Sequence, residues 1–463
     1  TKGELVRHYL AAPVIVTFVS AIIGNILGYT VFKELVVNMY YSNYSLPTYV
    51  TLWNPDAFIK TTIIPVVLMF VINLLILMRM LRHTPLQFLR CDLKKNKRKK
   101  AMRLPKWNFL SRFRLRIIFQ NIPNYLILFV GIAFISIMLA MAIGMPSTLQ
   151  YYKDNTKDMM IADYQYVLKS YKDETGKEIT TKNSDAEKFS MDSLLYKTDA
   201  MDEEVSVYGV EDTSKYISLP DAKNLKEKEV YISKPFRDKY DVAVGDTVTL
   251  NAKYEKKKYS FKVKGFFEHS QSIAVFMPIE QYRTAFDKDD DAFDGFFTNT
   301  KIKDVKKDYI ATVITEREIT KMSNQLDHTM GSYMLYFQFL CVVLSAVLIY
   351  LLTKIIIEKN EVAISMTKIL GYTDGEIAKL YLLATTIVVI VCAALSVLVG
   401  TLVMRNVWTV MLQSMSGWFT FIMGPLDYIK MFAFIFVGYL VVMLFDFRRI
   451  RKIPLDEALK RVE

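Results

Sequence analysis

The apolar residues of this 463-residue chain are gathered into six long blocks instead of being spread along it. The hydrocarbon layer of a membrane is about 30 Å thick, and a helix needs about 20 mostly apolar residues to cross it. Six stretches meet that length, at residues 10–32, 61–78, 117–143, 333–356, 380–404 and 428–446. We therefore expect an α-helical transmembrane bundle with six spans, and not a soluble globular enzyme.

Charges are sorted along the chain in a way that predicts its orientation. The formal net charge is +12, but the connector 79–116 alone carries fourteen Lys or Arg, and basic residues also follow the last apolar block at 448–452. Short loops rich in Lys and Arg stay in the cytoplasm. The loops 33–60 and 405–427 and the long region 144–332 are then expected outside the membrane, with both visible ends inside.

The chain contains an internal repeat. Residues 1–28 match 373–400 at a constant offset of 372, with identities that include Gly3 and Gly375, and Gly28 and Gly400. After the next loop the match resumes at an offset of 370, where Pro55 falls on Pro425. Matching Gly, Pro and polar residues on both sides of a loop indicates duplication. Residues 1–90 then form the two-helix tail of a first unit, whose front we expect to be missing, and residues 107–463 form a second unit.

Between the third and fourth apolar blocks, residues 147–332 change to short alternating segments separated by turn residues. The pattern predicts strands at 205–210, 229–233, 247–250, 259–263 and 273–277, and helices at 185–195, 279–286 and 316–330. We expect an α+β domain outside the membrane, preceded by a basic linker with an interfacial helix at 91–116 and a span at 117–143.

No motif in the sequence indicates catalysis. The zinc-protease helix motif, the nucleophile-elbow serine motif and the phosphate-binding loop are all absent from the sequence. Asp287, Asp289 and Asp291 have the spacing of a calcium loop, but Ala292 and Thr298 stand where such a loop needs Gly and Glu. We therefore expect a non-enzymatic chain that binds no metal and no cofactor.

A charged and apolar segment, 358–370, lies between the fourth and fifth spans and predicts a short helix that ends at a glycine. It contains Glu358, Glu361, Val362, Ala363, Ile364, Lys368, Leu370 and Gly371, and the chain ends with Pro454, Glu457, Ala458 and Leu459. These two stretches resemble the FtsX/MacB-type permeases of ABC transporters, in their long two-unit form. The domain at 147–332 looks like the extracytoplasmic MacB-like core of that family, and 333–463 looks like its three-helix permease domain.

The resemblance implies a partner and a mechanism. A separate cytoplasmic ABC ATPase, as a dimer, would bind ATP and Mg and push the helix at 358–370, which would tilt the spans and move the outside domain. The residues expected to couple the two subunits are Glu358, Glu361, Val362, Ile364, Lys368, Gly371 and Glu376. For Glu358 and Glu361, an ordinary solvated helix flank is the alternative.

Two functions remain open at the level of sequence. The first is export or extraction of amphipathic material such as lipoproteins, lipids or antimicrobial peptides, with membrane lipid and an extracellular peptide or protein as partners. The second is a regulatory mechanotransmitter that controls a cell-wall hydrolase or a sensor kinase. Both place the chain as a multi-pass protein in a bacterial plasma membrane, and neither involves nucleic acid.

Overall fold

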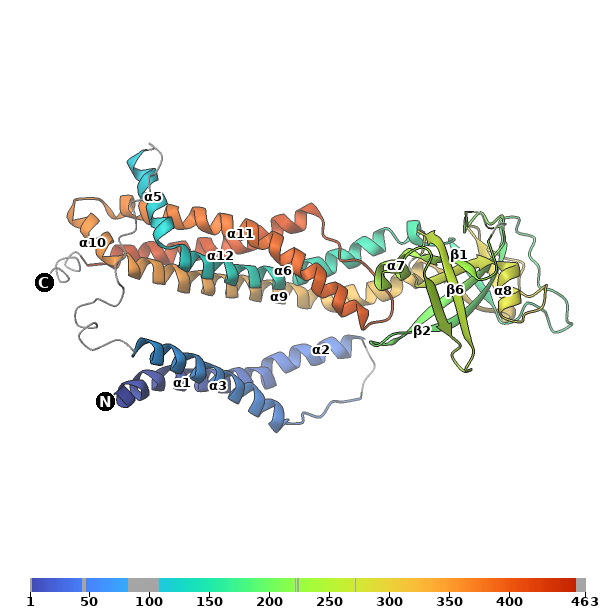
Figure 1. Cartoon of the computed structure of the whole chain (residues 1–463), viewed down its shortest axis with the longest axis horizontal. Coiled ribbons are helices and arrows are strands. Elements are labelled where there is room, and N and C mark those ends of the chain that lie inside the picture. Colours follow the sequence, from blue (N-terminus) through green and yellow to red (C-terminus); the bar gives the residue numbers. More distant parts are fainter. Residues whose placement is uncertain are drawn as a thin grey trace. The chain divides into compact units, whose positions relative to one another are not determined.

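The chain folds into two compact units, Thr1–Trp107 and Asn108–Glu463 (Figure 1). The structure is a computed structural model that describes residues 2–43, 47–81, 108–220, 222, 225–270 and 272–454. Most of the predicted linker at 91–116, and Glu457, Ala458 and Leu459 near the C-terminus, lie outside the described residues. Each unit is considered by itself below.

The first unit is built from two long apolar helices. The helix α1 (Lys2–Leu27) continues through a π-helical turn (Gly28–Phe32) into α2 (Lys33–Asn43), and α3 (Pro55–Met80) returns along α1. Asn25 joins them, because its amide donates to Thr62 Oγ1 over 2.9 Å and its carbonyl accepts from Thr61 Oγ1 over 2.6 Å. Most apolar side chains on the outside of the paired helices are exposed, as in helices that face lipid.

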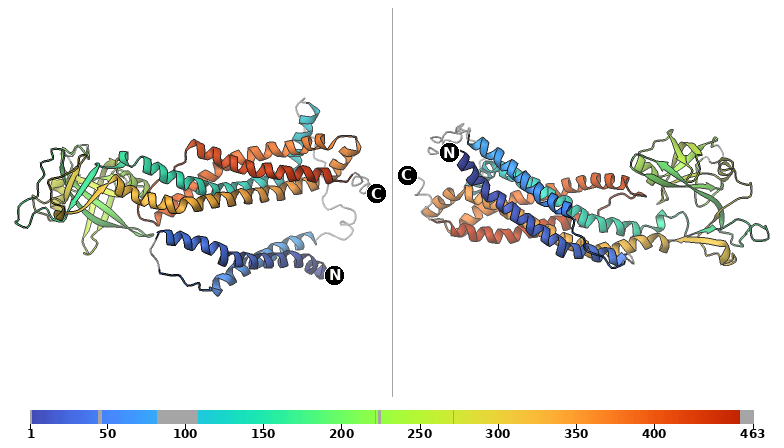
Figure 2. Two further views of the ribbon diagram at one scale, coloured as in Figure 1. Left: turned by 180° about the vertical axis from the view of Figure 1, so that it is seen from behind. Right: turned by 90° about the horizontal axis from the view of Figure 1, so that it is seen from below.

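The second unit contains a bundle of long helices (Figure 2). Its elements are α5 (Phe109–Gln120), α6 (Ile122–Asp154), α9 (Glu316–Lys359), α10 (Glu361–Ile369), α11 (Asp374–Gln413) and α12 (Pro425–Lys452). Leu128, Ile132 and Leu139 of α6 are fully buried at its centre. Within the described residues, six helices are long and apolar enough to cross a membrane, which confirms the six predicted spans.

One predicted boundary in this bundle is wrong. Residues 117–120 were expected to open the third span, but they belong to α5, and the span begins at Ile122. Asn121 separates the two helices, and Pro123 follows in the first turn of α6, where proline is well tolerated because that turn has no partner for its N–H. The basic and aromatic residues of α5 therefore form a helix of their own.

A mixed sheet domain (residues 161–315) connects α6 to α9. Its strands are β1 (Tyr164–Leu168), β2 (Glu187–Lys197), β3 (Asp202–Val210), β4 (Glu229–Ser233), β5 (Thr247–Asn251), β6 (Lys258–Phe267), β7 (Ala274–Pro278), β8 (Gly295–Thr298) and β9 (Ile310–Thr315). They form one sheet in the order β3-β7-β4-β6-β5-β2-β8-β1-β9. The helices α7 (Lys234–Tyr240) and α8 (Ile279–Ala285) accompany the sheet, which makes the domain α+β as predicted.

The predicted helix at 185–195 is wrong. These residues lie mostly in β2, which pairs antiparallel with β3 from Phe189 opposite Val210 to Lys197 opposite Asp202. Phe189 is fully buried, and its ring stacks on Phe297 of β8 with 4.1 Å between ring centroids. Cross-strand pairing and burial of this kind override a weak local helical preference. The strands β1, β8 and β9 were not predicted, whereas all five predicted strands are present.

Candidate functional site

The short helix α10 lies at one end of the bundle, and the sheet domain lies at the other (Figure 1). Gly371, which follows α10, has φ +89°, a left-handed conformation that glycine adopts without strain and that lets the chain reverse into α11. Thr373 then caps α11: the N–H of Glu376 donates to Thr373 Oγ1, and Glu376 Oε2 accepts from the N–H of Thr373 over 2.9 Å. These two features fix where α10 ends and α11 begins.

The inner face of α10 is anchored to the rest of the bundle. Ile364 is fully buried in an apolar cluster with Ile357, Ile377 and Ile450. Lys368 Nζ donates to the carbonyl oxygens of Arg451 and Ile453 and lies 3.1 Å from a carboxylate oxygen of Asp374. Ser365 Oγ donates to the carbonyl oxygen of Pro454 over 3.0 Å. Contacts with α9, α11 and the end of α12 therefore anchor α10 to the bundle.

The structure brings the predicted coupling residues together but does not expose all of them. Glu358, Gly371 and Glu376 are exposed, and Glu361 and Val362 are half-buried. Glu358 accepts from Arg449 Nη2 over 2.6 Å, so it also ties α9 to α12. Ile364 and the ammonium of Lys368 are occupied within the bundle, so these two residues hold the helix in place and do not lie on its outer surface.

The outer surface of α10 and of the turn that follows it carries exposed apolar side chains, a feature not predicted from the sequence. We name Met366, Ile369, Leu370 and Tyr372 the docking face, because all four are exposed, Leu370 by 72%. Met366 lies two residues after the buried Ile364 and therefore on nearly the opposite side of the helix, and Ile369, at the last position of α10, is exposed as well. An apolar patch beside charged residues is typical of a protein–protein contact.

At the opposite end, the sheet domain is fastened to the loop between α11 and α12. Glu203 of β3 and Lys239 of α7 form an ion pair whose side chains are 2% and 0% exposed. Lys239 Nζ also donates to the carbonyl oxygens of Met415, over 2.7 Å, and Gly417, over 3.2 Å. Glu203 Oε1 accepts from the N–H of Gly417 over 2.9 Å. We call these residues the clamp.

Burial and a third side chain complete the clamp. The hydroxyl of Tyr240 donates to Glu203 Oε2 over 2.9 Å. Burial, and next the Glu203 carboxylate, raise the pKa of Tyr240, so that it stays protonated and can act only as a donor to this oxygen. A buried carboxylate and ammonium are stable only when hydrogen bonds complete their pairing. The clamp meets that condition by using both side chains and the backbone of the loop.

The loop 414–424 also packs against the helices beneath it. Thr148 of α6 donates to the carbonyl oxygen of Ile422 over 2.9 Å and accepts from its N–H over 3.0 Å. Gly144 makes room for the ring of Phe421, since a Cβ there would lie 2.2 Å from Phe421 Cζ. Trp418 packs against both the bundle core and the core of the sheet domain. The loop is therefore the structural joint between the two.

A pocket of about 290 Å³ lies in the sheet domain, near the points where α6 enters it and α9 leaves it. Its apolar lining includes Met159, Met160, Ile161 and Ile319, and its polar lining includes Gln165 and Tyr208. Burial, the largest cause, raises the pKa of the Tyr208 hydroxyl, which keeps it a hydrogen-bond donor. Methionine and isoleucine side chains with a few polar groups favour a flexible apolar ligand with a polar end.

Two of the aspartates that have the spacing of a calcium loop contact other side chains of the domain. Asp287 pairs with Lys257 over 2.8 Å, and Asp289 accepts from the hydroxyl of Tyr171 over 2.6 Å. The described residues contain no group of three or more His, Cys, Asp or Glu side chains placed to hold a metal ion. The strands β5 and β6 pair antiparallel on either side of the turn before Lys258.

Comparison with known proteins matches both halves of the second unit. Residues 335–455 match the family FtsX-like permease C-terminal, and residues 124–314 match the family MacB-like periplasmic core domain. The crystal structure of the extracellular domain of the noncanonic ABC-type transporter YknZ from Gram-positive bacteria is 11% identical, with a TM-score of 0.21, over 37% of this chain and 94% of that chain. No curated protein matches the sequence. The chain is an FtsX/MacB-type permease of the ABC transporters, with an FtsX-like permease domain and a MacB-like core domain.

Proposed function

We propose that this permease carries motion from a separate ATPase, docked at α10, through α11 and α12 to the sheet domain, and that this motion extracts or exports an amphipathic substrate. The α10 end and both visible ends of the chain lie in the cytoplasm of a bacterial cell in this proposal, because the basic connectors flank that end. The ATPase acts as a dimer and binds the ATP and Mg. The sheet domain lies outside the plasma membrane.

The observation that carries the proposal is an unbroken path of contacts through the second unit. Lys368 and Asp374 join α10 to α11, whose 40 residues span about 60 Å at 1.5 Å per residue. Beyond the end of α11, Met415 and Gly417 accept from Lys239 in the sheet domain. Helices transmit displacement along their axes because their backbone hydrogen bonds resist stretching, so a push at α10 reaches the clamp.

The docking face supports a partner at α10. Leu370 and Ile369 are exposed apolar side chains, and an ATPase surface that covered them would gain about 25 cal/mol for each Å² of apolar surface removed from water. Glu361 and Glu376, both expected from the sequence to contact the ATPase, lie near this face in the chain. Their negative charges would favour a basic surface on the partner. Ile364 supports the face from within.

Co-purification with the partner ATPase tests this part. We expect Leu370→Glu to weaken ATPase binding at least tenfold, because it places a charge in the apolar contact. Lys430→Glu is the matched control, since Lys430 is an exposed charged residue at the far end of the bundle. Equal ATPase recovery with Leu370→Glu and with the unaltered chain would rule out docking on this face.

The pocket beside Gln165 and Tyr208 favours an amphipathic substrate over a purely regulatory role. A lipid-like or peptide ligand could place an apolar chain against Met159 and Met160 and its polar end beside Tyr208. A regulator of a hydrolase or kinase would instead hold a folded protein through the sheet domain. ATP-dependent release of a lipid or peptide supports extraction, whereas ATP-dependent capture of one extracellular protein supports the regulatory alternative.

A further inference from the structure

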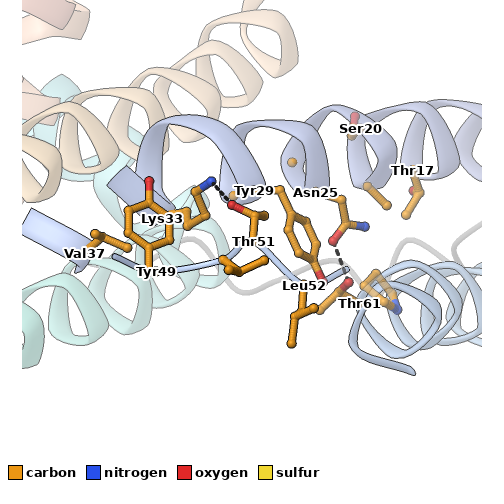
Figure 3. Close-up of a pocket in the computed structure, with 15 residues that line it drawn as sticks. Thr17, Ser20, Asn25, Tyr29, Lys33, Val37, Tyr49, Thr51, Leu52 and Thr61 are labelled. Carbon is orange, nitrogen blue, oxygen red and sulfur yellow. Dashed lines mark hydrogen bonds between the residues drawn. The ribbon is translucent and has the colours of Figure 1, made fainter. Parts of the chain in front are cut away.

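A groove of about 830 Å³ runs along the first unit, and its position is explained by the internal repeat (Figure 3). On α1 and the π-helical turn that follows it, the groove is lined by Thr17, Ser20, Ala21, Gly24, Asn25, Gly28 and Tyr29. At the offset of 372 these positions correspond to Val389, Cys392, Ala393, Ser396, Val397, Gly400 and Thr401. The latter seven are the residues of α11 between 389 and 401 that the structure buries.

The same correspondence holds on the second helix of the pair. The groove is lined on α3 by Thr61 and Pro65, which fall on Met431 and Ile435 of α12 at the offset of 370. Both Met431 and Ile435 are fully buried. The groove in the first unit therefore repeats, on two helices, a surface that is covered in the second unit.

In the second unit, α6 covers the part of this surface that lies on α11. Gly400 approaches α6 so closely that a Cβ would lie 2.7 Å from Ser136 Cβ and 2.8 Å from the Ser136 carbonyl carbon. One turn earlier, Ser396 Oγ contacts the carbonyl oxygen of Phe129, also on α6, over 3.5 Å. Small residues spaced four apart let two membrane helices approach in this way.

Within the described residues of the first unit, no helix packs on this small-residue stripe as α6 packs on α11. Ser20, Gly24 and Gly28 are also spaced four apart, and a Cβ at Gly24 or Gly28 would meet no atom within 4 Å. Half of the most apolar window of α11 is buried, against 6% of that of α1. Identical spacing on equivalent positions, open in one copy and occupied in the other, points to the same kind of occupant.

We propose that Ser20, Gly24 and Gly28 seat a transmembrane helix with the packing surface of α6, the counterpart of α6 in the first repeat unit. The groove differs from its copy in one respect: Asn25 and Thr61, which bond to one another over 2.6 Å, stand where α11 and α12 have Val397 and Met431. Because Asn25 is already bonded to both Thr61 and Thr62, it is paired within lipid, and the seated helix need not supply a polar partner for it.

A cross-linking experiment tests the seat with α6 as the probe. The full chain is placed in lipid nanodiscs, and a synthetic peptide of residues 122–154 is added with a photoreactive group in place of the Ser136 side chain. We expect cross-links to α1 at residues 20–28. The double change Gly24→Leu and Gly28→Leu should reduce them at least tenfold, and it should leave the fold intact because an added Cβ at either position meets no atom within 4 Å.

The matched control is the double change Val19→Leu and Ile23→Leu. Both side chains are exposed, and their counterparts Val391 and Leu395 are exposed on α11 as well, so this change should leave cross-linking unaltered. Equal cross-linking in the glycine variant would overturn the proposal. Loss of a chain dimer on changing Gly24 and Gly28, measured by the mass of the protein in nanodiscs, would also overturn it, because the occupant would then be a second copy.

Discussion

The ammonium group of Lys239, in the sheet domain, lies 2.7 Å from the carbonyl oxygen of Met415, just beyond the end of α11. Because Lys239 is fully buried and also paired with Glu203, it cannot leave this carbonyl without exposing or isolating a charge. In the proposed mechanism, this contact makes the sheet domain follow the end of α11, and the clamp is the mechanical link between them.

Removing one charge of the clamp should destabilise the protein strongly. We expect Lys239→Met alone, or Glu203→Leu alone, to lower the free energy of unfolding by about 3–5 kcal/mol, because each leaves a buried charge unpaired. The double variant should cost less than the sum of the two. Thermal unfolding of the two single variants and the double variant of the purified protein measures these free energies. Lys60→Met is the control, because Lys60 forms an exposed ion pair with Asp56, and its loss should cost under about 1 kcal/mol. Additive single effects would show that the two residues do not act together.

Gly28 and Gly400 occupy equivalent positions of the internal repeat, but replacing each by leucine should change the stability of the fold by different amounts. We expect Gly400→Leu to destabilise the bundle by roughly 1–3 kcal/mol, since the new side chain would meet Ser136 of α6. Gly28→Leu should change stability by under about 0.5 kcal/mol, because nothing lies within 4 Å of the added Cβ. Unfolding midpoints in detergent compare the two variants directly, and equal losses would contradict the packing described for α11 and α6.

Loosening α10 should be detectable by hydrogen exchange. Lys368→Met removes two hydrogen bonds to the carbonyl oxygens of Arg451 and Ile453 and the ion pair with Asp374. We expect faster exchange of backbone amides in 361–369 and 450–454, with no change in the sheet domain. Lys379→Met, at an exposed position near the start of α11, serves as the control. Unchanged exchange at α10 would show that Lys368 does not anchor it.

The sheet domain should lose stability in acid. The backbone N–H of Asn299, 2.8 Å from Asp185 Oδ2, is the main cause that lowers the pKa of Asp185, and the N–H of Lys182 does the same for Asp304. A lowered folded-state pKa contributes stability above the unfolded value of about 3.9, and that stability is lost as pH falls through the folded value.

The unfolding midpoint should therefore stay level from about pH 7 to pH 5 and fall below about pH 4. Asp185→Asn should lower the free energy of unfolding at neutral pH by roughly 1 kcal/mol, and it should make the fall of the midpoint in acid shallower. Asp290→Asn in an exposed loop is the control. An acid slope that is the same in the Asp185 variant and in the unaltered chain would show that this carboxylate does not govern it.

The sequence predicts the long helices well because the length and apolarity that a bilayer demands leave few alternatives. It does not predict β2, since a strand is defined by partners elsewhere in the chain, here Val210 opposite Phe189. The clamp was missed for the same reason. Glu203 and Lys239 are separated by 36 residues, Met415 lies far beyond both, and nothing local marks a buried charge.

At the other end, the sequence located α10 and its glycine break, because Gly371 and the cap at Thr373 are local signals. It did not show that Ile364 faces inward, since that depends on how α9, α11 and α12 surround the helix. The internal repeat is the one long-range signal that the sequence did contain, and the equivalence of Gly28 and Gly400 came from it.

The most direct test of the account is a distance across the joint, measured by electron spin resonance between labels at Leu126 of α6 and Tyr254 of the sheet domain. Both positions are exposed, Tyr254 by 96%, and the native Cys91, Cys341 and Cys392 are first replaced by alanine. With the partner ATPase bound, the account predicts that ATP shifts this distance, and that the double change Glu203→Leu and Lys239→Met reduces the shift by at least half. A distance that ATP leaves unchanged, or a shift of equal size in the double variant, would contradict it.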